Sequence, residues 1–368
     1  MKTRRLFYED VYIQEFEAIV LSCEEKDGKY HVILNATAFY PEGGGQPADK
    51  GMLDNIPVVD VQYIDGELCH IMESPLEEGA QVVGKIDWNW RFDLMQQHSG
   101  EHIVSGMIHE KYGYENVGFH MGEEIITIDL SGMLTWQQVQ EIEKKVNYYI
   151  WMNQQVNIFY PDERQRKFIP YRSKKELTGE IRLVEFPGAD LCACCGLHVT
   201  HASQIGLVKI LSCKKFRDGV RMEMLSGKRA LDYLSGSTEQ NSQIAVSLSV
   251  KENETKEAVQ RLLDEVYDLK GQLAQEKQKS FEAKAASFAG KGNVLLIEDT
   301  MEVAEVRKCT DSILNTCGGI AALFAGNDTD GYKYAIGERN GDIKELVKKV
   351  NKELNGRGGG KPFLHKVP

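Results

Sequence analysis

Two short pairs of metal-ligating side chains, far apart in the chain, restrict the fold more than any other feature. His98 and His102 are four residues apart, so in a helix both imidazoles project from one face. Cys194 and His198 repeat the same spacing. Three imidazoles and one thiolate suit zinc by ligand number and softness. A zinc site made from both pairs requires a fold that brings the two segments together.

Neighbouring side chains offer alternatives to this set of ligands. Cys192 and Cys195 are further thiols beside Cys194, and Cys195 is the better substitute for it. His201 is expected in a supporting or exposed position. The remaining histidines named here are expected to be ordinary core or surface residues: His31, His70, His109 and His365.

The helix pair also supports a competing interpretation. His98, Glu101 and His102 match the H-x-x-E-H pattern of inverzincin proteases, in which the Glu acts as the general base. That interpretation requires a carboxylate further along the chain as third ligand. It leaves Cys194 and His198 without a role, which favours the four-ligand zinc site.

Composition restricts the class of protein. The chain has 368 residues, so two or three domains are expected, and its 42% hydrophobic content contains no run long enough to cross a bilayer. Eight cysteines in so long a chain without a signal peptide indicate a cytoplasmic protein without a disulfide framework. A net charge of −11 excludes a generally basic nucleic-acid binder, although basic patches lie between Arg164 and Lys175 and after Gly341.

Hydrophobic patterns divide the chain into four regions of an α+β protein. Residues 1–90 predict a small β-rich, barrel-like domain. Residues 91–235 predict an α+β domain that holds the metal, with His98 and His102 in the first turns of a helix that ends at Gly113. Residues 236–292 predict a helical connector, and residues 293–368 a small α/β domain with a flexible glycine-rich end.

Finer predictions concern the surroundings of the metal. Residues 122–130 predict a strand, and Thr135 with Gln138 predicts the capping box of a following helix. Residues 181–186 and 205–211 predict the strands that enter and leave the cysteine cluster.

The connector contains a short apolar seam. Its residues are spaced three and four apart over two heptads: Val259, Leu262, Val266, Leu269 and Leu273. Such a seam can close a helical hairpin within one chain or join two copies of the chain. The sequence leaves both open, so a homodimer through residues 240–290 or the C-terminal domain is one expectation.

Three motifs in order carry a resemblance to a known family. The first, residues 39–47, reads Phe-Tyr-Pro-Glu-Gly-Gly-Gly-Gln-Pro and is followed by Asp49 and Gly51; the two Cys/His pairs come after it. This order resembles the editing half of alanyl-tRNA synthetase and its free-standing relatives, the AlaX-type alanyl-tRNA editing proteins. The likeness continues through residues 219–222, and the C-terminal region resembles the synthetase's DHH-associated domain. With no room for aminoacylation domains, the chain resembles the long trans-editing form.

The resemblance implies zinc-dependent hydrolysis of the ester that joins a wrong amino acid, serine or glycine, to the alanine tRNA. A pocket for alanine cannot exclude these two strongly, which is why a second hydrolytic site is needed. The resemblance places His120 against the substrate. Whether zinc or Glu101 activates water stays open, because Glu101 is equally expected on the helix surface.

The same resemblance implies contacts to the tRNA. Three glycines allow main chain to approach a ligand closely, although a tight turn explains them equally well. The implied substrate and tRNA contacts are Gly43, Gly44, Gly45, Gln46, Arg166, Lys167, Arg221, Arg357 and Lys361.

One position departs from the family pattern. The family usually reads Cys-Gly-Gly-Thr-His, whereas this chain has Cys195 and Leu197 at the second and fourth positions. Loss of the threonine hydroxyl is expected to change the orientation of a ligand or the choice of amino acid. A zinc-stabilised tRNA-binding protein without activity is therefore a third interpretation.

Overall fold

The computed structural model describes residues 2–173, 179–354, 356, 359–361 and 364–367. Contacts between residues divide the chain into two compact units, Met1–Gln240 and Asn241–Pro368. The mixed α+β class predicted from the sequence is confirmed. No helix among these residues is long and apolar enough to cross a membrane. The finer division into four regions stays a prediction.

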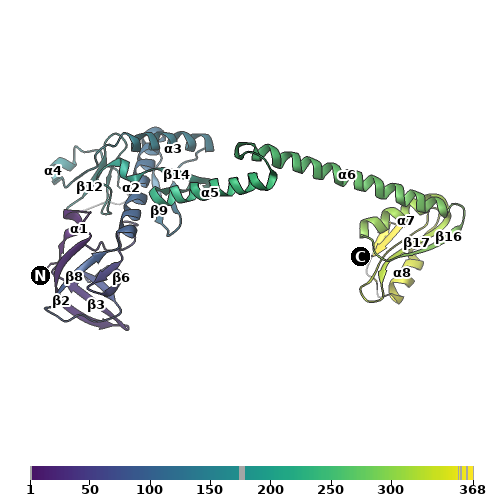
Figure 1. Ribbon diagram of the computed structural model, residues 1–368, viewed down its shortest axis with the longest axis horizontal. Coiled ribbons are helices and arrows are strands. Elements are labelled where there is room, and N and C mark those ends of the chain that lie inside the picture. Colours follow the sequence, from purple (N-terminus) through teal and green to yellow (C-terminus); the bar gives the residue numbers. More distant parts are fainter. Residues whose placement is uncertain (1, 174–178, 355, 357–358, 362–363, 368) are drawn as a thin grey trace. The chain divides into compact units, whose positions relative to one another are not determined.

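The first unit begins with a β-barrel (Figure 1). Its six strands close in the order β2-β3-β7-β6-β5-β8, and all neighbouring strands are antiparallel. The strands are β2 (Glu15–Lys26), β3 (Lys29–Leu34), β5 (Gly51–Leu53), β6 (Ile56–Ile64), β7 (Glu67–Met72) and β8 (Gln81–Ile86). The short elements β1 (Arg4–Arg5), α1 (Leu6–Glu9) and β4 (Ala36–Thr37) precede or interrupt it.

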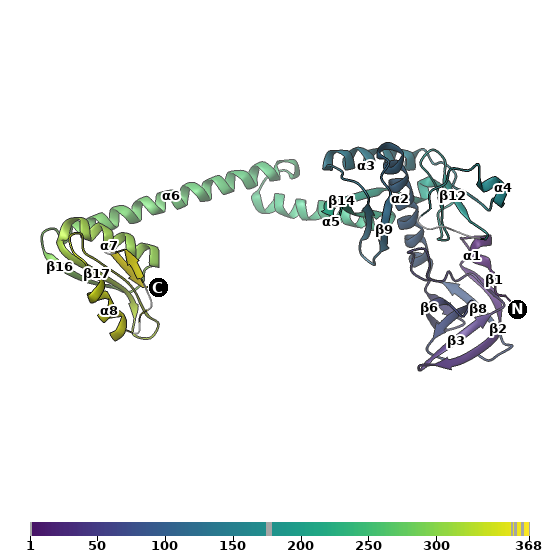
Figure 2. The same cartoon turned by 180° about the vertical axis from the view of Figure 1, so that it is seen from behind.

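A long helix, α2 (Trp88–Tyr112), leads from the barrel into the rest of the unit (Figure 2). The Asp87 carboxylate caps it by accepting a hydrogen bond from the Trp90 N–H, and Gly113 ends it in the left-handed conformation. Every residue from Leu94 to Gly106 is buried, so this helix is covered on all sides. His98 and His102 lie in the middle of α2, not in its first turns, because the helix begins earlier than predicted.

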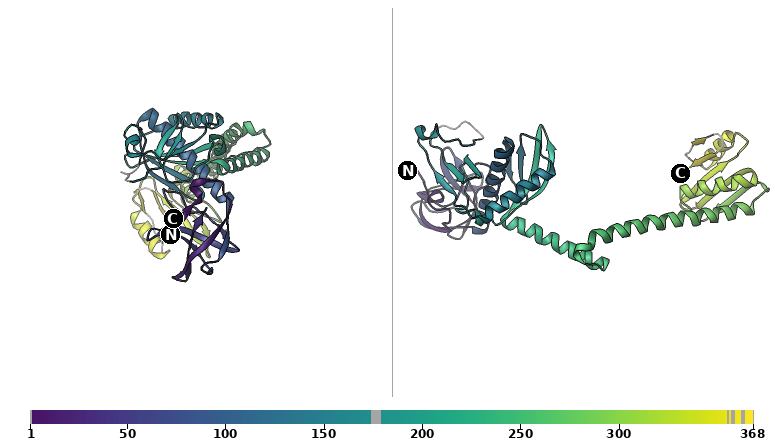
Figure 3. Two further views of the ribbon diagram at one scale, coloured as in Figure 1. Left: turned by 90° about the vertical axis from the view of Figure 1, so that its left-hand side faces the viewer. Right: turned by 90° about the horizontal axis from the view of Figure 1, so that it is seen from above.

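Two sheets and three helices form the next part of this unit, and both sheets and two of the helices contact α2. In the view from above, Figure 3 shows the dark-blue helix beside the sheet β14-β15-β10-β9. The elements are β9 (Asn116–Met121), β10 (Ile126–Leu130), β14 (Val208–Phe216), β15 (Gly219–Ser226), α3 (Trp136–Trp151), the 3-10 helix Ala202–Ile205, α4 (Glu163–Arg166) and a second sheet of β11 (Asn157–Phe159), β12 (Leu183–Phe186) and β13 (Asp190–Ala193).

Several predicted boundaries in this region need correction. The strand predicted at residues 122–130 begins only at Ile126, because a bend occupies the preceding residues. The strand predicted from residue 205 begins at Val208, after a 3-10 helix that holds Ile205. The capping box of α3, formed by Thr135 and Gln138, is confirmed.

A buried ion pair joins the barrel to α2. Arg91 in the first turn of the helix donates through Nε to both carboxylate oxygens of Asp49, at 2.8 and 2.9 Å. Both side chains are fully buried. Further hydrogen bonds go from Arg91 to the carbonyl oxygens of Val11 and Ala38, and from the Tyr40 N–H to Asp49. This network holds the N-terminal end of α2 against the loop that follows the glycine motif.

The second unit is an α/β layer structure. The boundary between the units falls within α5 (Gly227–Leu248), and the remaining elements follow in the order η2 (Glu252–Glu254), α6 (Thr255–Ser287), β16 (Gly292–Glu298), α7 (Val303–Cys317), β17 (Gly318–Asn327), β18 (Gly331–Gly337), α8 (Lys344–Glu353), β19 (Gly359–Lys361) and β20 (Leu364–Val367). Alternate residues of β17 face opposite layers: Leu323 packs with Val306 of α7, and Phe324 with Val347 of α8. The sheet order is β16-β17-β18-β20-β19.

Two predictions for this unit have clear outcomes. The seam residues of α6 are all exposed, between 40% for Val259 and 55% for Leu273, so no described part of the chain covers them fully. The glycine-rich end was predicted as a loop, but Gly359–Lys361 is a strand paired with β20, because the glycines' backbone groups bond into the sheet.

We predict that Asp49→Ala destabilises the first unit by about 3–5 kcal/mol, because the substitution leaves the buried Arg91 guanidinium without its counter-charge. Urea unfolding followed by tryptophan fluorescence measures this, since all four tryptophans lie in this unit. The exposed pair of Lys111 and Glu141 supplies the control, and Glu141→Ala is expected to leave the midpoint unchanged. An unchanged midpoint for Asp49→Ala would contradict the role given to the ion pair.

Candidate metal centre and its cavity

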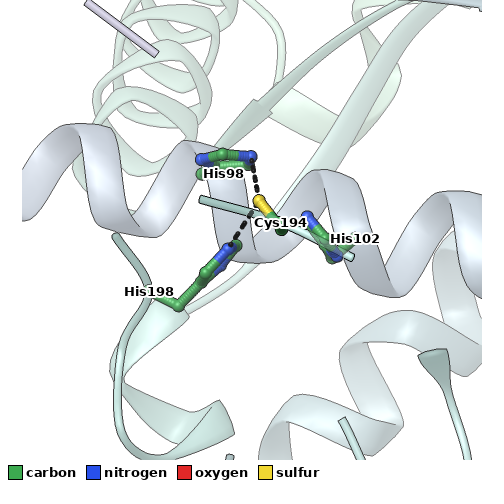
Figure 4. Close-up of side chains that lie close together, drawn as sticks. All are labelled: His98, His102, Cys194 and His198. Atoms are coloured by element: carbon green, nitrogen blue, oxygen red, sulfur yellow. Dashed lines mark hydrogen bonds between the residues drawn. The ribbon is translucent and has the colours of Figure 1, made fainter. Parts of the chain in front are cut away.

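The fold brings together the four side chains that the sequence predicted as metal ligands. His98 and His102 come from the middle of α2, and Cys194 and His198 come from the loop after β13 (Figure 4). One ligand atom from each lies within 4.8 Å of the others. The Cys194 Sγ lies 3.5 Å from the His98 Nε2 and 3.4 Å from the His198 Nε2. The donors therefore converge on one point.

Glycines allow the surrounding segments to approach α2 closely. A Cβ atom at Gly100 would lie 2.1 Å from the Ser226 Oγ, and one at Gly106 would lie 2.2 Å from the Ala189 carbonyl oxygen. In the loop after β13, a Cβ atom at Gly196 would lie 2.1 Å from the His98 ring. These positions admit only glycine without displacing backbone or a ligand.

Each imidazole is oriented through its Nδ1 atom. The His102 Nδ1 donates to the Asp190 carboxylate at 2.8 Å, and the His98 Nδ1 donates to the Gln46 side-chain oxygen at 3.0 Å. The His198 Nδ1 lies 3.2 Å from the Ser99 hydroxyl. A carboxylate and an amide oxygen can only accept, so the hydrogen sits on Nδ1 in His98 and His102. The Nε2 lone pairs of these two rings are thereby directed to the shared point.

The electrostatics of the centre favour a thiolate at Cys194 and a neutral ring at His198, whereas His102 must lose a proton when a metal binds. Burial by itself raises the pKa of Cys194, but the His98 and His102 imidazoles lower it well below its usual value. Burial and His98 lower the pKa of His198. For His102, burial lowers the pKa, but the Cys194 thiolate and Asp190 raise it well above its usual value. A thiolate and three imidazoles with directed Nε2 atoms fit zinc in donor type and number.

A second grouping, formed by His102, Asp190 and Cys192, shares a ligand with the first. Asp190 also accepts from the Arg172 Nε at 2.8 Å, so its carboxylate links the His102 ring to the Arg172 guanidinium. Burial raises the pKa of Cys192 to about 11, which keeps a protonated thiol there. In this grouping the Asp190 carboxylate orients the His102 ring, so we interpret the grouping as support for His102. The alternative ligand Cys195 instead packs against the glycine loop, where a Cβ atom at Gly44 would lie 2.9 Å from its Sγ.

The centre forms the floor of a cavity of about 610 Å³. Gly44 and Gly45 line one wall, and both have positive φ angles, +64° and +83°. Hydrogen bonds in both directions between Gly43 and Gln46 close a tight turn around them. The tight turn that the sequence offered as the alternative to a ligand-binding loop is therefore present. Its Gly44 and Gly45 also line the cavity. Gln46 itself is buried, and its side-chain oxygen accepts from His98 and from the Leu197 N–H.

Glu101 is buried and lines the cavity beside His98 and His102, so the expectation of a helix-surface position was wrong. Its carboxylate accepts hydrogen bonds from the Ser105 hydroxyl and the Asn116 side-chain amide. Glu101 is buried because α2 is covered on every side. The sequence does not reveal this, because polar residues occur on all faces of the helix.

His120 does not line the cavity, contrary to the expected substrate contact. It lies on β9 with its side chain exposed, whereas its neighbour Phe119 lines the cavity and stacks on the His98 ring with centroids 5.5 Å apart. Successive side chains of a strand point to opposite faces, so only one of the two can face the metal.

The predicted tRNA contacts outside the cavity are scattered. Arg166 donates to the Gly179 carbonyl oxygen, and Lys167 is exposed beside it. Arg221 forms a two-pronged ion pair with Asp129. Arg357, like the patch residues Lys174 and Lys175, lies outside the described residues, and for Lys361 only the strand is described.

Sequence reasoning missed several residues of the cavity. Asp190 precedes Cys194 by four residues. Residues an even number apart in a strand lie on one face, and this alternation was the only sequence signal that Asp190 lies near the ligands. Tyr8, Tyr160 and Arg182 line the cavity from segments that carry no motif. Leu197 is buried in the core and does not line the cavity, and Ser99 supplies the hydroxyl beside His198.

Family models match two parts of the chain. A model described as "tRNA synthetases class II (A)" matches residues 5–90. A model described as "Threonyl and Alanyl tRNA synthetase second additional domain" matches residues 181–222, which include Cys194 and His198.

Relatives match over nearly the whole chain. Alanyl-tRNA editing protein AlaX-L of Pyrococcus horikoshii is 28% identical, over 97% of this chain and 92% of the relative. Alanyl-tRNA editing protein Aarsd1-A of Xenopus laevis is 29% identical, over 96% of this chain and 90% of the relative. The chain is a homologue of the alanyl-tRNA editing proteins. The resemblance predicted from the three motifs is confirmed.

Longer relatives match only in part. Alanine–tRNA ligase of Ignicoccus hospitalis is 30% identical over 98% of this chain, but the match spans 40% of the ligase. The likeness to the ligases is therefore confined to one portion of their length.

We predict that Asp190→Asn lowers zinc affinity about 10- to 100-fold, because an amide cannot accept from both His102 and Arg172. Competition with a chromophoric chelator measures the affinity. Cys192→Ala, in the same strand, is the matched control and is expected to bind zinc as the wild type does. Equal weakening in both variants would instead make Cys192 a ligand.

Proposed function

We propose that this chain is a trans-editing hydrolase that deacylates tRNA(Ala) carrying serine, and also glycine, at a zinc-dependent site. One observation carries the proposal: three oriented imidazoles and a thiolate converge on the floor of a cavity that also holds a buried carboxylate, Glu101. The homology to alanyl-tRNA editing proteins supports the choice of substrate.

The chain's own residues divide the chemistry. His98, His102, Cys194 and His198 would hold zinc, which when bound supplies a Lewis acid for the ester. Glu101 is the proposed general base: it takes a proton from the attacking water and returns it to the ribose oxygen that leaves. Ser105 and Asn116 fix the orientation of the carboxylate by donating hydrogen bonds to it.

The cavity also accounts for exclusion of bulk water from the ester. Phe119 and the Gly44–Gly45 turn form an apolar wall beside His98, and a Cβ atom at Gly45 would lie 2.9 Å from the Phe119 ring. Because alanine is larger than glycine and smaller than serine, size alone cannot spare it, so a hydrogen bond to the serine hydroxyl is the proposed basis for hydrolysing serine and sparing alanine.

A peptidase of the inverzincin type is not favoured. Such an enzyme needs a carboxylate ligand, whereas Cys194 and His198 complete a set of four donors without one. The exposed Lys167 and the C-terminal unit are proposed to contact tRNA away from the cavity. The exposed seam of α6 supports a homodimer, which stays a proposal.

We predict that the zinc-loaded protein hydrolyses seryl-tRNA(Ala) and glycyl-tRNA(Ala) and spares alanyl-tRNA(Ala). Glu101→Gln is expected to lower kcat about 10²- to 10⁴-fold with zinc retained, because the base is lost and the ligands are not. Cys194→Ala is expected to weaken zinc binding, and Cys23→Ala, a half-buried thiol of the barrel, is the control.

The measurement is release of labelled amino acid from each charged tRNA. Ester loss no faster than the spontaneous rate, with zinc bound, would refute the proposed function. Tight tRNA binding without turnover would identify the inactive tRNA-binding protein instead.

A further inference from the structure

Tyr8 stands at the cavity with two guanidinium groups against its ring. The Arg5 guanidinium lies 5.3 Å and the Arg182 guanidinium 5.1 Å from the ring centroid. The Tyr8 hydroxyl donates to the Cys195 carbonyl oxygen at 2.8 Å, which ties the cluster to the loop that carries the metal ligands. All three side chains line the cavity.

Arg182 is a buried cation without a counter-ion among the residues that the structure describes. Only 8% of its surface is exposed, and its Nη1 donates to the carbonyl oxygens of Cys194 and Gly196, at 2.8 and 2.9 Å. Within the part of the chain that the structure describes, its Nε has no acceptor and its guanidinium forms no ion pair with a carboxylate. A buried charge without a partner destabilises the fold unless an anion binds and neutralises it.

Arg5 adds a second uncompensated cation. Its neighbour Arg4 is bound to Glu9, whereas within the described residues the Arg5 side chain has no hydrogen bond or ion pair, and its guanidinium lies over the Tyr8 ring. The cavity also contains the carboxylates of Glu101 and Glu180. Glu101 belongs to the floor, where it accepts from Ser105 and Asn116, and Glu180 is an exposed residue next to Ile181.

An exposed aromatic ring completes this side of the cavity. Tyr160 follows β11, lines the same cavity and keeps 46% of its surface exposed. Uncompensated arginines beside an exposed aromatic ring are the combination that binds single-stranded nucleic acid, through phosphate contacts and base stacking. The cavity volume of about 610 Å³ falls within the range of small-ligand sites.

We propose that Arg5, Arg182 and Tyr160 form a subsite for the 3′-terminal nucleotides of an RNA: the arginines bind phosphate, and the Tyr160 ring stacks on a base. The assignment rests on the proposed function for the identity of the ester beyond the nucleotide. It adds how the RNA end is held, so that the aminoacyl ester lies over the metal centre. Arg182 acts in two ways, because the same side chain holds the carbonyl groups of the ligand loop.

The test separates phosphate contacts from base contacts by using two substrates. Seryl-tRNA(Ala) carries phosphates, whereas 3′-O-seryl-adenosine has the ester and the base alone. Arg5→Gln is expected to raise KM about tenfold for the tRNA and not for seryl-adenosine. Tyr160→Ala is expected to raise KM about tenfold for both, because one stacked base is lost. The value of kcat should stay unchanged in each.

Matched controls come from the same chain. Arg4→Gln removes a neighbouring arginine that pairs with Glu9, and Tyr148→Ala removes an exposed tyrosine of α3 that does not line this cavity. Both are expected to behave as the wild type. Zinc content, measured for every variant, reveals any loss of the metal centre.

Binding of fluorescent cytidylyl-cytidylyl-adenosine, followed by anisotropy, tests the subsite without turnover. Arg5→Gln and Tyr160→Ala are expected to weaken it, each about tenfold. If the wild type binds this trinucleotide and the variants do not, yet no ester is cleaved, the subsite stands and the proposed function fails. If the wild type is active and both variants match the controls on both substrates, the subsite is refuted.

Discussion

The first unit depends on the complete burial of a polar helix. Residues 94–106 of α2 include two glutamines, two histidines, a glutamate and two serines, and a buried polar group without a partner is costly. Each of these side chains is therefore matched by another segment. Gln96 donates to the Gln204 carbonyl oxygen and Gln97 to that of Ser226, while the two histidines bond to Gln46 and Asp190. The helix can form only where barrel, sheets and ligand loop meet.

This constraint explains why the metal centre draws on distant parts of the chain. The barrel contributes Gln46 through its glycine turn, β13 contributes Asp190, and the loop after β13 contributes two ligands. The hydrogen bonds that satisfy the buried helix are the same ones that direct the imidazoles. Stability and ligand orientation thus rest on one network, and the buried pair of Arg91 and Asp49 anchors its barrel end.

Floor and side wall of the cavity have different properties. The floor carries thiolate, imidazoles and a hydrogen-bonded carboxylate, which suit ester hydrolysis. The side wall carries Arg5 and Arg182, which have no counter-ion among the described residues, and an exposed tyrosine, and these groups suit a nucleotide. Tyr8 and Arg182 connect the two, because both bond to carbonyl groups of the Cys194–Gly196 loop.

The sequence by itself determined the local features: the four candidate ligands through their paired spacing, the end of α2 at Gly113, the capping box of α3, and the resemblance to the editing proteins. The spacing of side chains along a helix or loop is set by backbone geometry, so it can be read from the sequence without knowing the fold. Only the tertiary structure decided that Glu101 is buried, that Phe119 rather than His120 faces the metal, and that Asp190, Tyr8 and Arg182 belong to the cavity. These depend on which segments pack against α2, and burial and partner choice are properties of contacts between segments far apart in the sequence.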